Sequence, residues 1–265
     1  MKTNFRLLAV TFTLLCASLA GCFGDDEVDS GEYDGPIDLI VYYDTTAGII
    51  ETSENNGQTG PTTGVELSFD FADTTSDDGS IAKIMIDPDD GSDPVEGDPA
   101  DNAVISYTWM THGVFTVTLT AEDDEGNSHS MMVKVKIDMH IVWTETNTAS
   151  ASMQFDATPD CEDGDPLPDR ITISSTVENP AQFIGGGNSD VTWSLNNPTD
   201  EEISSSSGTL GNGASETWDY TTRDIVEGFW TLNVEVTNGD DVNVNNDVTI
   251  AYAEGAEDPT NSRPE

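Results

Sequence analysis

The chain has 265 residues, with 51 Asp and Glu against 8 Lys and Arg, which gives a formal net charge of -43. A charge this negative repels nucleic-acid phosphates and anionic lipid headgroups, and no basic cluster beyond the N-terminus reverses the repulsion locally. We therefore exclude DNA and RNA as partners. The length accommodates two small domains, and 5 Trp, 6 Tyr and 9 Phe recur inside alternating apolar runs that can bury a core.

The N-terminus predicts export and lipid attachment. Lys2 and Arg6 precede an apolar stretch, residues 7–20, that is too short to be a permanent membrane span. It ends in Leu19-Ala20-Gly21-Cys22, which resembles the lipobox of prokaryotic lipoproteins; the alternative is an ordinary signal with a chance cysteine. The resemblance implies cleavage before Cys22 and a lipid on Cys22. Cleavage would remove two bases and no acids, so the mature chain would hold 51 acids and 6 bases, a charge of -45.

Cysteine usage leaves no internal disulfide to expect. Cys16 lies in the signal, 1–21, and Cys22 would carry the lipid, so Cys161 would remain alone. An acidic loop raises the pKa of a thiol, and we therefore expect Cys161 to be inert.

The first half of the chain predicts strands. Residues 22–35 are acidic, contain Gly and show no period, and we interpret them as a flexible tether. Beyond them, period-two alternation recurs, and no long window has the apolar spacing of a helix. The clearest strands of this half are residues 65–71, 114–121 and 133–137.

A second series of strands follows Asp138. Its seven short segments are separated by turns of Gly, Asn, Asp and Ser, as in a β-sandwich of about 100 residues. The predicted strands are residues 141–143, 153–155, 171–177, 191–195, 218–220, 230–236 and 248–252. We predict an all-β chain of two tandem immunoglobulin-like β-sandwiches, residues 36–138 and 139–253, after the lipoprotein signal peptide. Residues 254–265, with two prolines and four acids, read as a disordered acidic tail.

Four sequence blocks in the first predicted sandwich share an order and spacing. They are FDFADTTSDDGS at residues 69–80, IDPDDG at 86–91, YTW at 107–109 and HGVFTVTLTAEDDEG at 112–126. Together they resemble the PKD domain, an immunoglobulin-like module of extracellular proteins. Ile86 and Pro88 depart from the family pattern, which has Trp and Phe at these positions of its WDFGDG block. The resemblance implies an immunoglobulin-like fold for residues 36–138.

The second predicted sandwich has a weaker resemblance. Residues 171–179, 210–215 and 227–234 are similar to CARDB-like, adhesion-associated sandwiches of prokaryotic surface proteins. This similarity implies the fold of these residues and does not identify a ligand.

Catalytic signatures are missing from the sequence. It contains no nucleophile elbow, phosphate-binding loop or HExxH motif. His112, His129 and His140 lie in or beside predicted turns without a partner nearby in sequence, and we expect His112 to be a turn residue. We predict that the protein is not an enzyme.

One acidic turn is a candidate metal site. Asp87, Asp89, Asp90 and Asp93 place hard oxygen donors around Gly91, a combination that suits Ca²⁺. The alternative is that Asp and Gly simply close a β-turn, through side-chain hydrogen bonds and tolerance of positive φ. The sequence indicates no other cofactor.

The spread of acids through both predicted domains and both tails favours a solvated acidic surface, as in proteins of saline environments, over a specific basic partner. We expect a non-enzymatic protein, lipid-anchored to the cell membrane of an archaeon or bacterium and facing the extracellular side. It would bind or adhere to an extracellular protein or polysaccharide, or act as a spacer. The alternative is an accessory binding subunit of a secreted hydrolase or transporter complex.

Overall fold

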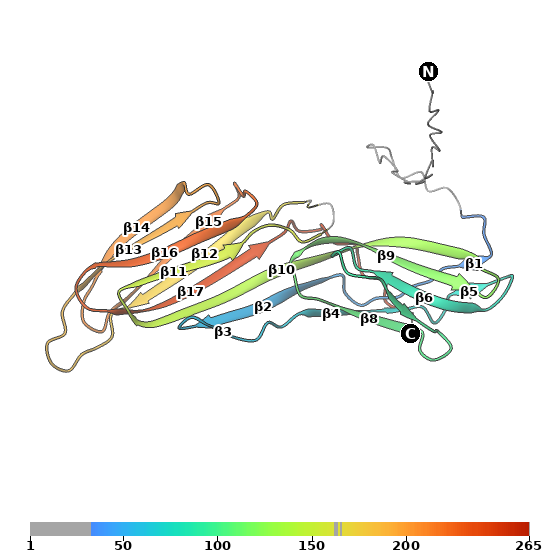
Figure 1. Ribbon diagram of the computed structural model, residues 1–265, viewed down its shortest axis with the longest axis horizontal. Helices are drawn as coiled ribbons and strands as arrows, with labels where there is room; N and C mark the ends of the chain where they lie inside the picture. Colours follow the sequence, from blue (N-terminus) through green and yellow to red (C-terminus); the bar gives the residue numbers. More distant parts are fainter. Residues whose placement is uncertain (1–32, 162–163, 165, 265) are drawn as a thin grey trace, which may run out of the picture. The chain divides into compact units, whose positions relative to one another are not determined.

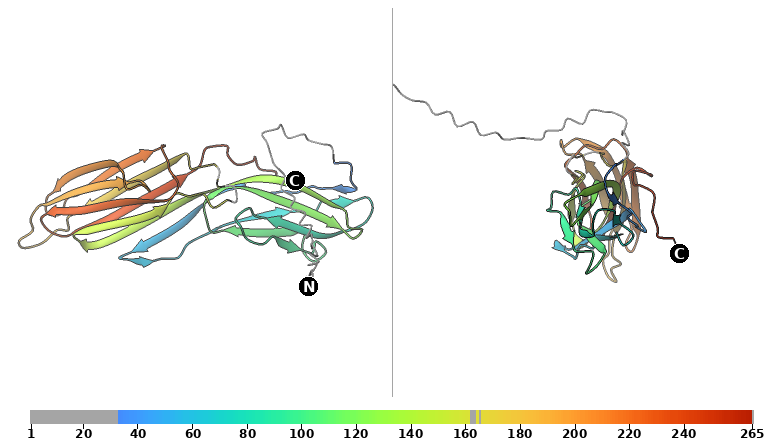
Figure 2. Two further views of the ribbon diagram at one scale, coloured as in Figure 1. Left: turned by 45° about the horizontal axis from the view of Figure 1, so that its top comes forward. Right: turned by 90° about the vertical axis from the view of Figure 1, so that its right-hand side faces the viewer.

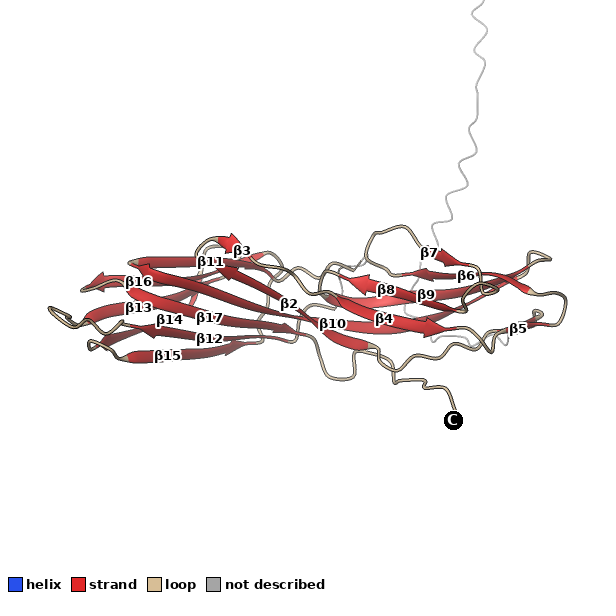
Figure 3. Ribbon diagram, turned by 90° about the horizontal axis from the view of Figure 1, so that it is seen from below, coloured by secondary structure: helices blue, strands red, loops and turns tan. Residues whose placement is uncertain are grey.

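The computed structural model describes residues 33–161, 164 and 166–264. These residues form strands and loops and contain no helix, so none of them belongs to a helix that could cross a membrane (Figure 3). The all-β prediction is confirmed for this part of the chain. The signal peptide, Cys22 and most of the predicted tether lie outside the described residues.

The strands surround two separate apolar clusters, which we call the first core and the second core. The strands at the first core are β1 (Ile37–Asp38), β4 (Val65–Asp70), β5 (Thr75–Ser76), β6 (Ile81–Asp87), β7 (Val95–Gly97), β8 (Val104–Trp109) and β9 (Gly113–Asp123). Those at the second core are β11 (Ser150–Asp156), β12 (Arg170–Glu178), β13 (Ser189–Asn196), β14 (Glu202–Leu210), β15 (Ser215–Thr222), β16 (Phe229–Asn238) and β17 (Val242–Ala251). The remaining strands are β2 (Ala47–Asn55), β3 (Gln58–Thr59) and β10 (Ser128–Thr148).

Trp109 fills the first core near the turn where Ile86 and Pro88 depart from the PKD pattern. The Trp109 side chain is fully buried, and its indole N–H donates to the Pro88 carbonyl oxygen at 3.2 Å. Its ring lies 4.8 Å from that of Tyr107 and 6.0 Å from that of Phe115, centroid to centroid. Ile86 is also fully buried. An aromatic side chain from β8 therefore packs this part of the core.

The second core lies between two sheets. Strands β11-β16-β13-β14 form one of them, and β15-β12-β17 with the C-terminal half of β10 form the other. Trp193 of β13 and Trp230 of β16 are fully buried between them. The Trp193 indole N–H donates to Ser175 Oγ at 3.0 Å, and Ser175 Oγ donates to Asn246 Oδ1 at 2.6 Å. Each of these three atoms has a partner, whereas the Nδ2 atom of the buried Asn246 has none among the described residues, so the network is only partly satisfied.

One strand, β10, belongs to both cores (Figure 1, Figure 2). Its residues 128–137 pair with β9, residues 136–144 with β2, and residues 139–148 with β17. Since a strand has one neighbour on each side, β9 and β17 follow one another along one edge, and β2 lies on the other. We expected one domain to end at Asp138 and separate strands at 133–137 and 141–143. Instead, Asp138 lies inside a single continuous strand, and Gly35–Glu265 is one compact unit.

The C-terminal segment, residues 254–264, is held against the first core, contrary to the expected disordered tail. Asp258 donates its N–H to the Lys134 carbonyl oxygen at 3.0 Å and accepts the Lys134 N–H on Oδ2 at 2.8 Å. Asn261 exchanges two backbone hydrogen bonds with Tyr43. The edge of β10 beside Lys134 has backbone groups without a strand partner, so this acidic segment finds hydrogen bonds there and covers the edge.

Charge also fixes this segment. Arg263 pairs with Asp70 and Asp73 and lies over the Tyr42 ring, and Lys136 contacts Glu257 at 2.9 Å. Because Arg263 near its end is basic, this otherwise acidic segment can pack against a surface that is itself acidic.

Candidate functional site

The four predicted calcium ligands lie at the turn between β6 and β7. Asp90 accepts hydrogen bonds from the Tyr107 hydroxyl at 2.5 Å and from Ser92. Asp89 accepts the Thr116 N–H at 2.6 Å, and Asp87 accepts the Asp89 N–H at 3.3 Å. The carboxylates of Asp89 and Asp90 thus fasten the turn to β9 and β8.

The backbone of this turn follows β-turn chemistry. Asp89 and Gly91 have φ of 62° and 76°, which Asp and Gly tolerate. Asp93 is exposed. Within the described part of the chain, no three His, Cys, Asp or Glu side chains are grouped so that they could hold a metal ion. The calcium site at Asp87, Asp89, Asp90 and Asp93 stays a prediction.

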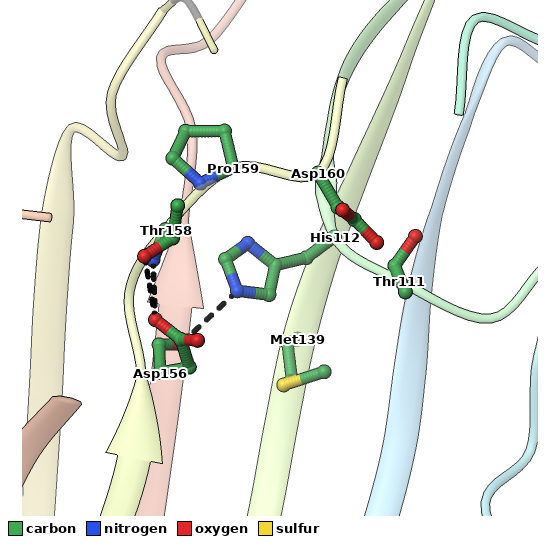
Figure 4. A pocket seen from close by; sticks show the side chains of 7 residues that line it. All are labelled: Thr111, His112, Met139, Asp156, Thr158, Pro159 and Asp160. Carbon is green, nitrogen blue, oxygen red and sulfur yellow. Dashed lines mark hydrogen bonds between the residues drawn. The ribbon is translucent and has the colours of Figure 1, made fainter. Parts of the chain in front are cut away.

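A hollow of about 420 Å³ opens where β9, β10 and β11 meet (Figure 4). It is lined by Thr111, His112, Met139, Asp156, Thr158, Pro159 and Asp160. The lining combines a buried imidazole with two carboxylates, so it is the place in the described structure at which acid–base chemistry has to be considered.

Both ring nitrogens of His112 form hydrogen bonds within the protein. Nε2 lies 3.1 Å from the carbonyl oxygen of Asp156, which can only accept, so Nε2 carries the proton. Nδ1 is therefore the acceptor of the Tyr252 hydroxyl at 2.8 Å. Burial lowers the pKa of His112, against the opposing effect of Asp156, Asp160 and Asp138, which favours this neutral form. His112 joins the start of β9 to the ends of β11 and β17.

Of the two threonine hydroxyls that line the hollow, that of Thr158 also forms hydrogen bonds within the protein. Thr158 Oγ1 donates to Asp156 Oδ1 at 2.7 Å and accepts the Gly228 N–H at 3.0 Å. In this structure the Nδ1 lone pair of the neutral imidazole accepts the Tyr252 hydroxyl and is not hydrogen-bonded to the Thr158 hydroxyl. The hydrogen bonds of His112 and Thr158 therefore join neighbouring segments of the fold to one another.

The expectation that all three histidines lie in or beside turns is wrong for His140, which is inside β10. His129 is the second residue of β10 and lies beside the turn between β9 and β10. His129 Nδ1 lies 3.0 Å from the Ile37 carbonyl oxygen, and His140 Nε2 lies 3.0 Å from Asp247 Oδ1. Their positions depend on strand pairing with distant segments, which sequence neighbours do not reveal.

Cys161 is buried, and burial raises the pKa of its thiol, as expected for an inert group.

The loop between β12 and β13, residues 179–188, has hydrogen bonds near both of its ends. Asn212 accepts the Gln182 N–H at 2.7 Å and donates to the Gln182 carbonyl oxygen at 3.1 Å. Gly187 donates its N–H to Asp240 Oδ2 at 2.9 Å, and its carbonyl oxygen accepts from Asn179 at 2.9 Å. In Figure 1 this is the tan loop that extends beyond the ends of the strands.

The tip of this loop is apolar and exposed. Phe183 is fully exposed and Ile184 is 84% exposed. Gly185, at φ 82°, and Gly186, where a Cβ would overlap the Asn212 side chain, permit the tight path between the two anchored ends. The strand pattern of the sequence does not predict this loop; its signal is the pair of large apolar residues before three glycines in a polar stretch.

Comparison with protein families confirms the predicted resemblance. Residues 52–137 match the family model of the PKD domain, so this segment of the chain is a PKD domain. The match ends at Ile137, inside β10. A comparison with curated protein sequences finds no significant match.

Several solved structures are distantly similar to the chain. A carbohydrate-binding module of the β-sandwich superfamily is 15% identical, covering 83% of this chain and 98% of its own, with a TM-score of 0.30. A chain of the disulfide-linked pili that are Bacillus endospore appendages is 17% identical over 44% of this chain and 86% of its own, at 0.24. Tripeptidyl peptidase 2 is 6% identical over 81% of this chain and 20% of its own, at 0.28. Scores this low carry no argument about function.

Proposed function

We propose that the protein is a non-enzymatic, lipid-anchored surface protein that binds an extracellular partner and holds the bound partner away from the membrane. In this proposal the chain consists of the PKD domain and a second immunoglobulin-like sandwich joined through β10, and Cys22 carries the anchor. The acidic tether would separate the folded unit from the membrane.

The observation that carries the binding role is the apolar tip of loop 179–188. A soluble surface that exposes Phe183 and Ile184 side by side keeps unfavourable contact with water unless a partner covers them. Hydrogen bonds with Asn212, Asn179 and Asp240 hold the loop near both of its ends, so little conformational entropy would be lost when the tip is bound. Large apolar side chains on a pre-ordered loop favour an extracellular protein as the partner at this place.

The spacer role is supported by β10. A continuous strand of 21 residues is about 70 Å long, and it is paired along its length with β9, β2 and β17. His112 adds hydrogen bonds at the point where β9 gives way to β17. A surface of the second core would therefore be held at a fixed distance from the PKD domain.

The binding role is tested with the loop tip. On a sensor chip carrying a panel of secreted and surface proteins, the double variant Phe183→Ser/Ile184→Ser should lose at least tenfold in affinity for the protein that the wild type binds. The matched control is Ile49→Ser/Met132→Ser, which removes two exposed apolar side chains elsewhere and should bind as the wild type does. Equal loss in both variants, or no loss in the loop variant, would argue against the loop as the binding surface.

The anchor is tested separately. Cys22→Ser should abolish labelling of the protein by a fatty-acid analogue and release the protein from the membrane fraction, because the substitution removes the thiol that the lipid would modify. Fractionation of cells that express each form measures the release. Persistent detergent-dependent membrane association of the variant would instead indicate an uncleaved N-terminal segment.

A further inference from the structure

A second concave site lies beside the second core. It is a groove of about 490 Å³, within the range of about 300–1,000 Å³ of small-molecule sites. Its lining comes from β2 and β3, from β10, and from β11, and consists of Thr52, Ser53, Glu54, Thr59, Ile141, Trp143, Ser152, Met153 and Gln154.

Strand register explains one wall of the groove. Strands β2 and β10 run parallel, with Thr52 beside Ile141 and Glu54 beside Trp143. Because side chains two residues apart point to the same face, these four side chains share one face of the sheet. The opposite wall is β11, an edge strand whose only neighbour in its sheet is β16. The groove is the open side of the sandwich between these walls.

Trp143 places a hydrogen-bond donor in this groove. Its side chain is only 6% exposed, and among the described residues its indole N–H has no hydrogen-bond partner, unlike those of Trp109, Trp193 and Trp230. Among the described residues, the fully enclosed side-chain atoms with neither a hydrogen bond nor an ion pair belong to Asn179 and Asn246 and do not include the Trp143 nitrogen. The Trp143 N–H therefore reaches open space, and the groove is the open space that Trp143 lines.

Acceptors and further donors line the same groove. The Glu54 carboxylate and the Gln154 amide have no hydrogen-bond partners within the described part of the chain, and both line the groove. Ser and Thr hydroxyls add groups that donate and accept, and Ile141 and Met153 add apolar surface. The lining thus offers donors, acceptors and apolar contact within one small volume.

The charge of the groove and of the whole chain limits which class of ligand can bind there. Glu54 is the only charged residue of the lining, and the whole chain carries -43, so an anionic ligand is repelled. A cation would satisfy Glu54 but has no acceptor for the Trp143 N–H. A neutral polyhydroxylated ring satisfies both, since each hydroxyl donates and accepts and the C–H faces pack on apolar side chains.

We propose that this groove binds a neutral saccharide unit of an extracellular polysaccharide, with the Trp143 N–H, Glu54 and Gln154 as its hydrogen-bonding groups. The inference deepens the proposed binding function and rests on it. The site is separate from loop 179–188, and the two can be disabled independently.

The test is calorimetric titration of the full mature chain with neutral oligosaccharides of α- and β-linked hexoses and pentoses. We expect saturable binding of at least one, with an affinity about 5- to 100-fold lower for Trp143→Phe, because that variant keeps a ring in the core and removes the donor. Trp218→Phe is the matched control: Trp218 is a partly buried tryptophan of β15 outside the groove, and this variant should bind normally. Gln154→Ala, at an exposed position, should weaken binding without affecting folding.

Three results would overturn the proposal: no saturable binding of any neutral oligosaccharide, unchanged affinity in both Trp143→Phe and Gln154→Ala, or equally tight binding of oligogalacturonate, which is anionic. An extended neutral peptide that binds in place of the sugars, and is lost in Trp143→Phe, would also overturn it and assign the edge of β11 to strand addition. If the wild type binds a protein through the loop but binds no saccharide, the groove is not a saccharide site and the proposed binding function still stands. If the wild type binds neither a protein through the loop nor a saccharide, the proposed binding function is also wrong.

Discussion

The unfolding midpoint of the protein should rise strongly when the NaCl concentration is raised from about 0.15 M to 1 M, because this shortens the screening length from about 8 Å to about 3 Å. Like charges about 10 Å apart in water repel by about 0.4 kcal/mol per pair. With 51 acids in the chain, several dozen such pairs would oppose a stability of about 5–15 kcal/mol. Charge repulsion is therefore a first-order contribution to the free energy of unfolding.

The structure indicates that the few bases cannot relieve this repulsion. Lys83, Lys136, Arg170, Arg223 and Arg263 each already contact one or two carboxylates. Eight bases against 51 acids leave most of the surface without a compensating charge. Except for the more buried Lys136–Glu257, these ion pairs are partly exposed to solvent, where each contributes about 0–1 kcal/mol.

Salt also strengthens the burial of apolar surface, so the control is a change of charge. Six exposed acids can be made neutral without removing an ion pair or side-chain hydrogen bond seen in the described structure. They are Glu66, Asp101, Glu125, Glu216, Glu227 and Glu235, replaced by Gln or Asn. This variant should be more stable than the wild type at low salt and should respond less to NaCl. A wild-type midpoint that does not move between the two salt concentrations would show that repulsion is unimportant.

The second large effect should come from the cores. Trp109→Ala in the first core and Trp230→Ala in the second should each lower the free energy of unfolding by about 3–5 kcal/mol, since each empties a fully buried site. Trp109→Ala also leaves the buried carbonyl oxygen of Pro88 unpaired, whereas Trp230→Ala removes a hydrogen bond to the carbonyl oxygen of Val226, an exposed residue.

We expect both variants to shift one common transition. Strand β10 contributes to both cores, so unfolding either core removes hydrogen-bonding neighbours from the other. Circular dichroism at far- and near-ultraviolet wavelengths, with hydrogen exchange resolved between β4 and β13, measures whether the two cores unfold together. Two separate transitions, each moved by only one variant, would mean that residues near Asp138 act as a domain boundary despite the continuous strand.

Local patterns in the sequence were sufficient for many of the strands and for the PKD domain, although no predicted segment covers β2 or β14. In residues 114–121 the alternation of Phe115, Val117 and Leu119 with threonines predicts a strand and its buried face, and β9 has this face. Such a prediction succeeds because side-chain period and burial are properties of the strand itself. The order and spacing of the PKD blocks likewise depend only on neighbours along the chain.

Tertiary structure decided how these elements are joined and where candidate sites form. Nothing near Asp138 in sequence distinguishes a linker from a strand, because the continuity of β10 follows from its pairing with β2, β9 and β17, which are distant in the chain. The acidic composition of residues 254–264 predicts disorder, whereas in the structure hydrogen bonds to Lys134 and Tyr43 hold this segment in a defined position. The groove at Trp143 joins residues 52–59 to residues 141–154. Contacts between residues this far apart depend on the register of the assembled sheets, and no local pattern encodes it.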